Sequence, residues 1–138
     1  MLKRDFIIKV IFFIFLAAFF LILYLADTGQ NRSALDMLGH LEYGDKYAHF
    51  LIYGLLSIQL NLVLKLRVIS LFSIKIYYGS LITLIFSILE ELSQGFIPYR
   101  NLDFGDFLAN TFGILTFFVI TKLIEHRKKG TDTEKTIS

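Results

Sequence analysis

The chain has no cysteine, no tryptophan and a single proline among its 138 residues. Without cysteine it can form no disulfide framework, no zinc–thiolate site and no thiol nucleophile. Its 14 Lys and Arg residues form no basic patch interleaved with aromatic residues, so nothing indicates nucleic-acid binding. These absences exclude disulfide scaffolds, thiol enzymes and nucleic-acid-binding modules.

Apolar residues are abundant instead. Hydrophobic residues make up 55% of the chain, with 15 phenylalanines and a mean hydropathy of +0.62. A soluble domain of this size cannot bury so much apolar surface. The composition therefore predicts a helical membrane protein whose partner is the lipid bilayer.

Four segments are apolar enough to be membrane spans, at about Phe6–Ala26, Tyr47–Leu64, Ile76–Leu92 and Phe107–Thr121. Spanning backbone must satisfy its own hydrogen bonds, and the alternation typical of a barrel strand is missing, so we expect helices. The apolar core of the first segment is too long for a signal peptide, which favours a retained anchor. The predicted fold is an all-α bundle of four transmembrane helices within residues 1–124.

The Lys and Arg residues predict the orientation of this bundle. With a cytoplasmic N-terminus, 11 of the 14 lie on the cytoplasmic side and only Arg32, Lys46 and Arg100 lie outside. Both termini are then cytoplasmic, and residues 125–138 are predicted to be a basic, disordered tail.

The first outer connector, Asp27–Gly44, contains leucines at every third position from Leu35 to Leu41. Ser33, followed by Asp36, weakly resembles a capping box. The segment is either a short interfacial helix or a loop that dips its leucines into the membrane.

Polar residues recur at helical spacing at the outer end of three spans. One stripe runs from Asp45 through His49 to Tyr53, and a second joins Glu91 to Gln94. The third stripe comprises Asp103, Asp106, Asn110 and Gly113. Because all three belong to the same predicted leaflet, they indicate a shared outward-facing polar pocket.

Simpler roles exist for some of these residues. Asp45, Asp103 and Asp106 are suited to helix capping, and Lys46 and Arg100 to contact with headgroups. His49, Glu91 and Asn110 lie about a turn inside their spans, where polar groups are costly and indicate function. Adjacent residues point about 100° apart on a helix, so we expect Glu91 to face the pocket and Glu90 to face the headgroups.

Two blocks of sequence resemble the VanZ-like family of bacterial integral membrane proteins. The first is "DKYAHFLIYGLL" (Asp45–Leu56), and the second is "ELSQGFIPYRNLDFGDFLANTFG" (Glu91–Gly113). The resemblance is carried by Asp45, Lys46, His49, Phe50, Glu91, Gln94, Pro98, Arg100, Asp106, Asn110 and Gly113. It implies a multi-pass protein of the bacterial cytoplasmic membrane with a role in the cell envelope. The family's namesake is linked to low-level resistance to teicoplanin, a glycopeptide.

Three functions remain open from the sequence. The first is a binding protein whose outer pocket takes a glycopeptide or a lipid-linked envelope precursor. Arg100 and Lys46 would then pair with phosphate or carboxylate, and Asp45, Gln94 and Asn110 would complete the ligand-binding set.

The second is an intramembrane hydrolase or transferase that acts on a lipid-linked envelope substrate. His49, Glu91 and Asp106 would be its catalytic residues or the ligands of a divalent metal. The third is purely structural, with the stripes forming interhelical hydrogen bonds. An open cavity would favour the first two functions, and closed direct pairs the third. The sequence assigns no cofactor and leaves a metal, the ligand and the oligomeric state undetermined.

Overall fold

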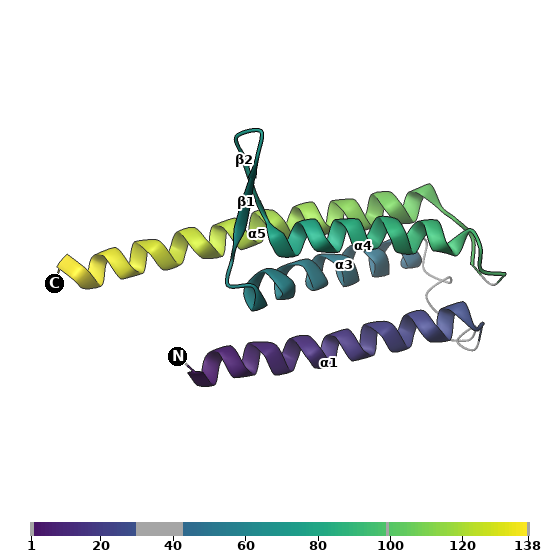
Figure 1. Cartoon of the computed structure of the whole chain (residues 1–138), viewed down its shortest axis with the longest axis horizontal. Coiled ribbons are helices and arrows are strands. Elements are labelled where there is room, and N and C mark those ends of the chain that lie inside the picture. Colours follow the sequence, from purple (N-terminus) through teal and green to yellow (C-terminus); the bar gives the residue numbers. More distant parts are fainter. Residues whose placement is uncertain (1, 30–42, 99, 138) are drawn as a thin grey trace.

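The computed structural model describes residues 2–29, 43–98 and 100–137, with Leu2 and residues 128–137 described by their backbone alone. These described residues form four helices and one β-hairpin (Figure 1). The elements are α1 (Leu2–Asp27), α3 (Gly44–Val63), β1 (Val68–Leu71), β2 (Ile74–Tyr77), α4 (Tyr78–Gln94) and α5 (Phe104–Ile137). The predicted helical architecture is confirmed, and the crossing of a membrane by all four helices stays a prediction.

Helix α3 lies at the centre of the bundle and contacts α1, α4 and α5, most extensively α5. Glycine makes this last contact possible. A Cβ on Gly113 would lie 2.1 Å from the carbonyl oxygen of Phe50, and one on Gly54 would lie 2.3 Å from the Phe117 ring. Small residues that let helix backbones approach are typical of membrane bundles. This close approach brings the beginnings of α3 and α5 together.

Helix α4 is polar inside and apolar outside. Its buried residues are all small or polar, namely Gly79, Ser80, Thr83, Ser87, Glu91 and Gln94. Its large exposed side chains include Ile82, Ile85, Leu89 and Leu92. A helix in a water-soluble bundle has the opposite pattern.

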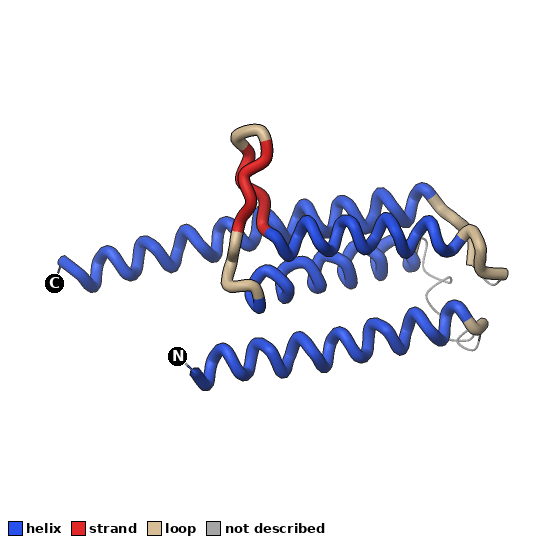
Figure 2. The backbone as a smooth tube through the Cα atoms, in the orientation of Figure 1, coloured by secondary structure: helices blue, strands red, loops and turns tan. Residues whose placement is uncertain are grey.

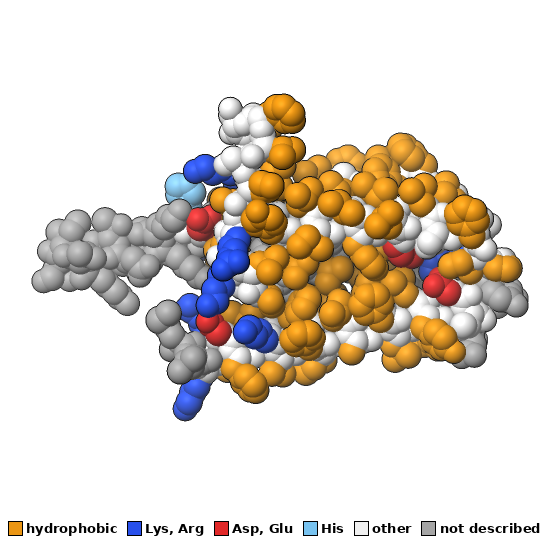
Figure 3. Space-filling view, viewed as in Figure 1, with side chains coloured by type: hydrophobic (Ala, Val, Ile, Leu, Met, Phe, Trp, Pro, Cys, Tyr) orange, Lys and Arg blue, Asp and Glu red, His pale blue; other side chains and the backbone are white. Residues whose placement is uncertain are grey.

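The outer surface of the bundle is apolar over most of its length. Figure 3 shows a broad band of apolar side chains, with charged side chains towards its two ends. Two helical stretches, Lys3–Asp27 and Phe104–Arg127, are long and apolar enough to cross a membrane. The 20 residues of α3 and the 17 of α4 make both helices shorter than these stretches.

The structure differs from the expected fold in two places. The connector between the second and third predicted spans contains an antiparallel hairpin, in which Val68 pairs with Tyr77 and Leu71 with Ile74. At the C-terminus, α5 continues to Ile137, although we expected residues 125–138 to be disordered. No proline interrupts this stretch, and its Lys and Glu residues favour helix. The predicted interfacial helix between Asp27 and Gly44 falls largely on residues 30–42, which lie outside the described residues.

Candidate functional site

The polar ends of α3, α4 and α5 meet at one end of the bundle, because α3 and α5 begin where α4 ends. Figure 2 shows the α4–α5 loop at this end and the hairpin at the opposite end. We call the end that contains the α4–α5 loop the acidic end. It contains Asp27, Asp45, Lys46, His49, Tyr53, Glu90, Glu91, Gln94, Arg100, Asp103, Asp106 and Asn110.

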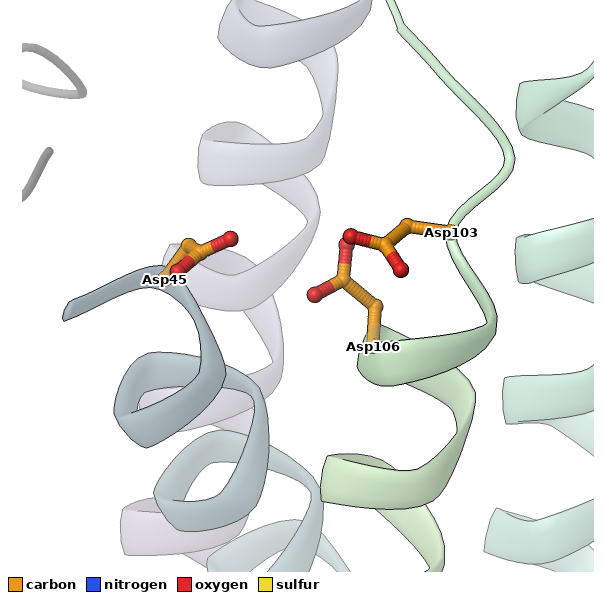
Figure 4. Close-up of side chains that lie close together, drawn as sticks. All are labelled: Asp45, Asp103 and Asp106. Atoms are coloured by element: carbon orange, nitrogen blue, oxygen red, sulfur yellow. The ribbon is translucent and has the colours of Figure 1, made fainter. Parts of the chain in front are cut away.

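Lys46 lies among three carboxylates. Its Nζ is 2.9 Å from an oxygen of Asp45 and 2.5 Å from oxygens of both Asp103 and Asp106. The three aspartates come from the first turn of α3 and the beginning of α5, and their carboxyl groups point toward one another (Figure 4). Lys46 therefore joins α3 to α5 electrostatically.

The charges of this cluster shift the pKa values of its members. The hydrogen bond from Lys46 lowers the pKa of Asp103. Burial by itself would raise the pKa of Asp45, but the hydrogen bond and charge of Lys46 outweigh it and lower that pKa. Burial would likewise lower the pKa of Lys46, yet its hydrogen bonds to the three aspartates raise it. All three groups thus stay charged across the neutral range.

Carboxylate oxygens of Asp45, Asp103 and Asp106 lie within 4.8 Å of one another, close enough for a hard divalent cation. The Lys46 ammonium already contacts all three carboxylates, so it supplies the positive charge that a metal would bring. The sequence left a metal undetermined, and it suggested His49, Glu91 and Asp106 as metal ligands only as a variant of the enzymatic alternative. Among the described residues the converging acids are these three aspartates instead, because the α4 end brings Glu91 to the backbone of the α4–α5 loop.

His49 lies one turn deeper, between two residues of α5. Its Nδ1 is 3.0 Å from Oδ1 of Asn110, and its Nε2 is 3.7 Å from Oδ2 of Asp106. The ring stacks on Tyr53 with centroids 6.2 Å apart. Both ring nitrogens thus face a polar side chain of α5, Asn110 at hydrogen-bond distance and Asp106 beyond it.

Glu90 and Glu91 both belong to the site, which corrects the expectation that only Glu91 faces inward. Glu90 accepts hydrogen bonds from the Tyr53 hydroxyl (3.0 Å) and from the Gln94 amide (2.9 Å). Glu91 accepts one from the backbone N–H of Asp103 at 2.9 Å. The two side chains thus have different main partners, α3 for Glu90 and the α4–α5 loop for Glu91, while the Gln94 amide lies near both carboxylates.

Arg100 links this network to α1. Its Nε donates to Oε1 of Gln94 at 3.3 Å, and its two terminal nitrogens lie 3.7 Å from Glu90 and 3.9 Å from Asp27. The side chain is only 15% exposed. Arg100 is thus engaged by carboxylates rather than presented freely to an anion.

The acidic end is a set of direct pairs with an excess of acid. Six carboxyl groups, those of Asp27, Asp45, Glu90, Glu91, Asp103 and Asp106, face Lys46, Arg100 and one histidine. Two buried side-chain atoms of this end, Oδ1 of Asp27 and Nδ2 of the fully buried Asn110, have no hydrogen-bond partner among the described residues. Direct pairs between side chains are what we expect if the polar residues serve only to hold the helices together. That purely structural role does not explain why carboxyl groups outnumber cations here.

The structure brings together all eight predicted site residues, namely Asp45, Lys46, His49, Glu91, Gln94, Arg100, Asp106 and Asn110. Sequence reasoning left Glu90 out, although its i, i+4 spacing to Gln94 was a usable signal. It placed Tyr53 and Asp103 on the stripes but not in the site. No local signal connects Asp27 to Arg100, because the two lie 73 residues apart in the chain and meet only through packing.

A scan against protein-family models finds no match for this chain. Searches of curated proteins and of solved structures likewise find no match. The resemblance to the VanZ-like family therefore depends on the two motif blocks alone.

Proposed function

We propose that the chain is a four-span membrane protein of the bacterial cell envelope that binds an amphiphilic molecule carrying a positive charge at its acidic end. The membrane part of the proposal is supported by the polar interior and apolar exterior of α4. In water, the exposed Ile82, Ile85 and Leu89 would be costly and the buried Ser80, Thr83 and Ser87 would gain little.

The sign of the ligand charge follows from one observation, the excess of carboxyl groups over cations at the acidic end. Lys46 and Arg100 are both held by carboxylates, so an anionic ligand would have to displace Asp103, Asp106 or Glu90. An ammonium group would meet the half-exposed carboxylates of Asp45 and Asp103 at the rim. The Lys46 ammonium, which contacts three carboxylates, illustrates how these aspartates bind a positively charged group.

The class of ligand is supported by the resemblance to the VanZ-like family. It suggests two candidates, a glycopeptide and a lipid-linked envelope precursor. The charge balance favours a candidate that presents an amine near the headgroup region over one that presents only phosphate. A role in resistance to teicoplanin-type glycopeptides is part of this proposal.

The absence of cysteine offers a direct test of the topology. Single-cysteine variants Asn101→Cys, in the α4–α5 loop, and Ser73→Cys, at the hairpin tip, are treated in intact cells with a membrane-impermeant maleimide. We expect labelling of Asn101→Cys in intact cells and of Ser73→Cys only after permeabilisation. Labelling of both positions from the same side would overturn the four-span arrangement.

The ligand is tested with purified protein in nanodiscs of neutral lipid. Binding of an alkyl-ammonium amphiphile is compared with that of an alkyl phosphate of the same chain length. We expect the ammonium to bind more tightly, and we expect Asp45→Asn combined with Asp103→Asn to remove that preference. Equal or tighter binding of the phosphate amphiphile to the unmodified protein would overturn the cationic ligand.

A further inference from the structure

The end of the bundle opposite the acidic end contains the hairpin, which has two chemically different faces. Directly opposite residues of an antiparallel pair share a face. The pairs Ile69–Ile76 and Leu71–Ile74 therefore form one entirely aliphatic face. The other face carries the polar pair Ser70–Lys75 towards the tip and the pair Val68–Tyr77 at the base. The hairpin is thus amphipathic across its thickness.

The tip and the adjoining half of the aliphatic face are exposed, whereas Ile69 and Ile76 near the base are partly buried. Leu71 is 46% exposed, Ile74 62% and Phe72 96%. Phe72 and Ser73 form the two-residue turn with φ values of 47° and 72°. Such a turn normally uses Asn or Gly, because other residues are strained at positive φ. Burial of the exposed Phe72 ring in an apolar environment would therefore provide favourable free energy that offsets the strain of its backbone.

The base of the hairpin is fixed to the bundle. The Tyr77 side chain is buried, packs edge-on against Phe118 with centroids 5.3 Å apart, and donates its hydroxyl hydrogen to Glu125. The backbone N–H of Tyr78 bonds to the carbonyl of Arg67 at 3.0 Å. The hairpin is consequently held in a set direction, projecting sideways from the bundle (Figure 1). If the helices cross the membrane, this direction lies along its surface.

Basic residues surround the hairpin. Lys and Arg side chains gather across the bundle at the level of the hairpin base, where the apolar band ends (Figure 3). Exposed basic side chains at this end include Lys65, Arg67, Lys75 and Lys122. The side chains of Arg67 and Lys75 have no hydrogen-bond or ion-pair partner among residues 2–29, 43–98 and 100–137. Their charges are available to an external anion.

A groove lies at the hairpin base, beside these charges. It has a volume of about 430 Å³ and is lined by Leu64, Arg67, Val68, Tyr78 and Ile82. Apart from Arg67 and the Tyr78 hydroxyl, the lining is aliphatic or aromatic. The groove thus offers apolar walls for a chain and one guanidinium for a phosphate, which is the chemistry of a phospholipid.

We propose that the hairpin lies flat in the membrane interface of the Lys/Arg-rich side and that the groove at its base binds an anionic phospholipid of that leaflet. The aliphatic face and Phe72 enter the acyl region, while Ser70 and Lys75 face the headgroups and water. Arg67 pairs with the lipid phosphate, and an acyl chain follows Leu64, Val68 and Ile82. The proposal rests on the membrane location proposed above and is independent of the ligand at the acidic end.

The absence of tryptophan makes the hairpin part directly testable. Single-tryptophan variants Phe72→Trp, Ser70→Trp and Phe13→Trp are reconstituted into vesicles that contain bromine-labelled lipids. Phe13 is 61% exposed on α1 and reports membrane insertion of the bundle itself. We expect quenching by bromolipid at positions 13 and 72, and quenching by aqueous iodide at position 70.

The outcomes separate the two proposals. Quenching at position 13 without quenching at position 72 overturns the interfacial hairpin and leaves the membrane location intact. Absence of bromolipid quenching at position 13 overturns the membrane location and with it the hairpin proposal. Bromolipid quenching at position 70 equal to that at position 72 overturns the two-faced orientation.

The lipid site is tested by measuring which lipids stay with protein purified from mixed phosphatidylglycerol and phosphatidylcholine vesicles. We expect phosphatidylglycerol to be enriched and its retention to fall about tenfold in Arg67→Gln, because the phosphate loses a charge-assisted hydrogen bond that a merely nearby cation does not supply. Arg4→Gln is the matched control, because it removes the same charge from the exposed beginning of α1. Equal retention in Arg67→Gln and Arg4→Gln, or no enrichment in the unmodified protein, overturns the site.

Discussion

The two ends of the bundle use charge in opposite ways. At the acidic end Lys46 and Arg100 are held by carboxylates from all four described helices, and their side chains are 24% and 15% exposed. At the hairpin end Arg67 and Lys75 are exposed and have no described partner. The first arrangement stabilises contacts between helices, whereas the second leaves charge available to the surroundings. Mutations at the acidic end should therefore affect folding, and mutations at the hairpin end should affect interactions with lipid.

The largest expected effect comes from removal of the cation that the aspartates share. Lys46→Met keeps the length of the side chain but leaves three carboxylates within 4.8 Å of one another. We expect a loss of about 2–3 kcal/mol in the free energy of unfolding, because the partner groups keep their charge and Asp106, unlike Asp45 and Asp103, is shielded from water. The measurement is equilibrium unfolding in mixed micelles.

Lys65→Met is the control at the other end of α3. The Lys65 side chain is 72% exposed and its ion pair with Asp5 is 3.8 Å long, so the loss should stay below about 0.5 kcal/mol. Adding Asp103→Asn to Lys46→Met should restore part of the lost stability. Equal losses in Lys46→Met and Lys65→Met would contradict the difference between the two ends.

A smaller loss is expected where the α3–α5 contact is tightest. In Gly113→Ala the new Cβ would meet the backbone of Phe50, so the helices must move apart, at a cost of about 2 kcal/mol. The same unfolding experiment measures it. Gly95→Ala is the matched control, since the atom nearest to a Cβ there lies at 3.5 Å. A loss in Gly95→Ala as large as that in Gly113→Ala would show that the close approach is not the cause.

The pH dependence of stability should reflect the acidic end. The pKa values of Asp45 and Asp103 are lowered, so their contribution is complete above their ordinary value of 3.8 and is lost as pH falls below it. The pKa of Lys46 is raised, so its contribution persists below 10.5 and is lost only at still higher pH. Thermal denaturation in detergent from acid to neutral pH measures the first transition, and Asp103→Asn should reduce it. An unchanged acid transition in that variant would show that protonation of groups other than Asp103 causes the loss of stability at low pH.

The smallest effect on stability is expected at the hairpin. Lys75 is exposed and unpaired among the described residues, so Lys75→Gln should change the free energy of unfolding by less than about 0.5 kcal/mol. The informative readout is instead the fraction of anionic lipid retained, which should fall. A large loss of stability with unchanged lipid retention would contradict the inference that charge at the hairpin end contacts lipid rather than stabilising the fold.

Much of the helical layout could be predicted because its signals are local. Runs of apolar residues indicated four helices, and i, i+3 and i, i+4 spacings indicated which side chains of one helix share a face. Asp103 was expected to cap its helix, and it does so by accepting a hydrogen bond from the backbone of Gly105 at 2.7 Å. Within the bundle, the amide of Asn61 on α3 donates to Ser80 of α4 at 2.9 Å.

The errors arose where partners come from distant parts of the chain. Helical angles suggested that Glu90 would point away from the site, but Tyr53 of α3 lies on that side of α4. The hairpin could not be predicted from turn residues, because Phe72 and Ser73 occupy positions that usually contain Asn or Gly. The helical tail beyond residue 124 follows from continuation of α5, a cooperative effect that composition does not report.

The sequence by itself determined that the segments between the connectors are apolar and form four helices. It also determined that acidic residues are concentrated at one end of these helices and basic residues at the other. These properties depend on neighbours within a turn or two of the same helix. Only the tertiary structure decided that Lys46 pairs with three aspartates and that Arg100 lies near Asp27. It also decided that Glu90 and Glu91 both accept hydrogen bonds within the site. Those pairings depend on how closely α3 and α5 approach, which the glycines permit but do not specify.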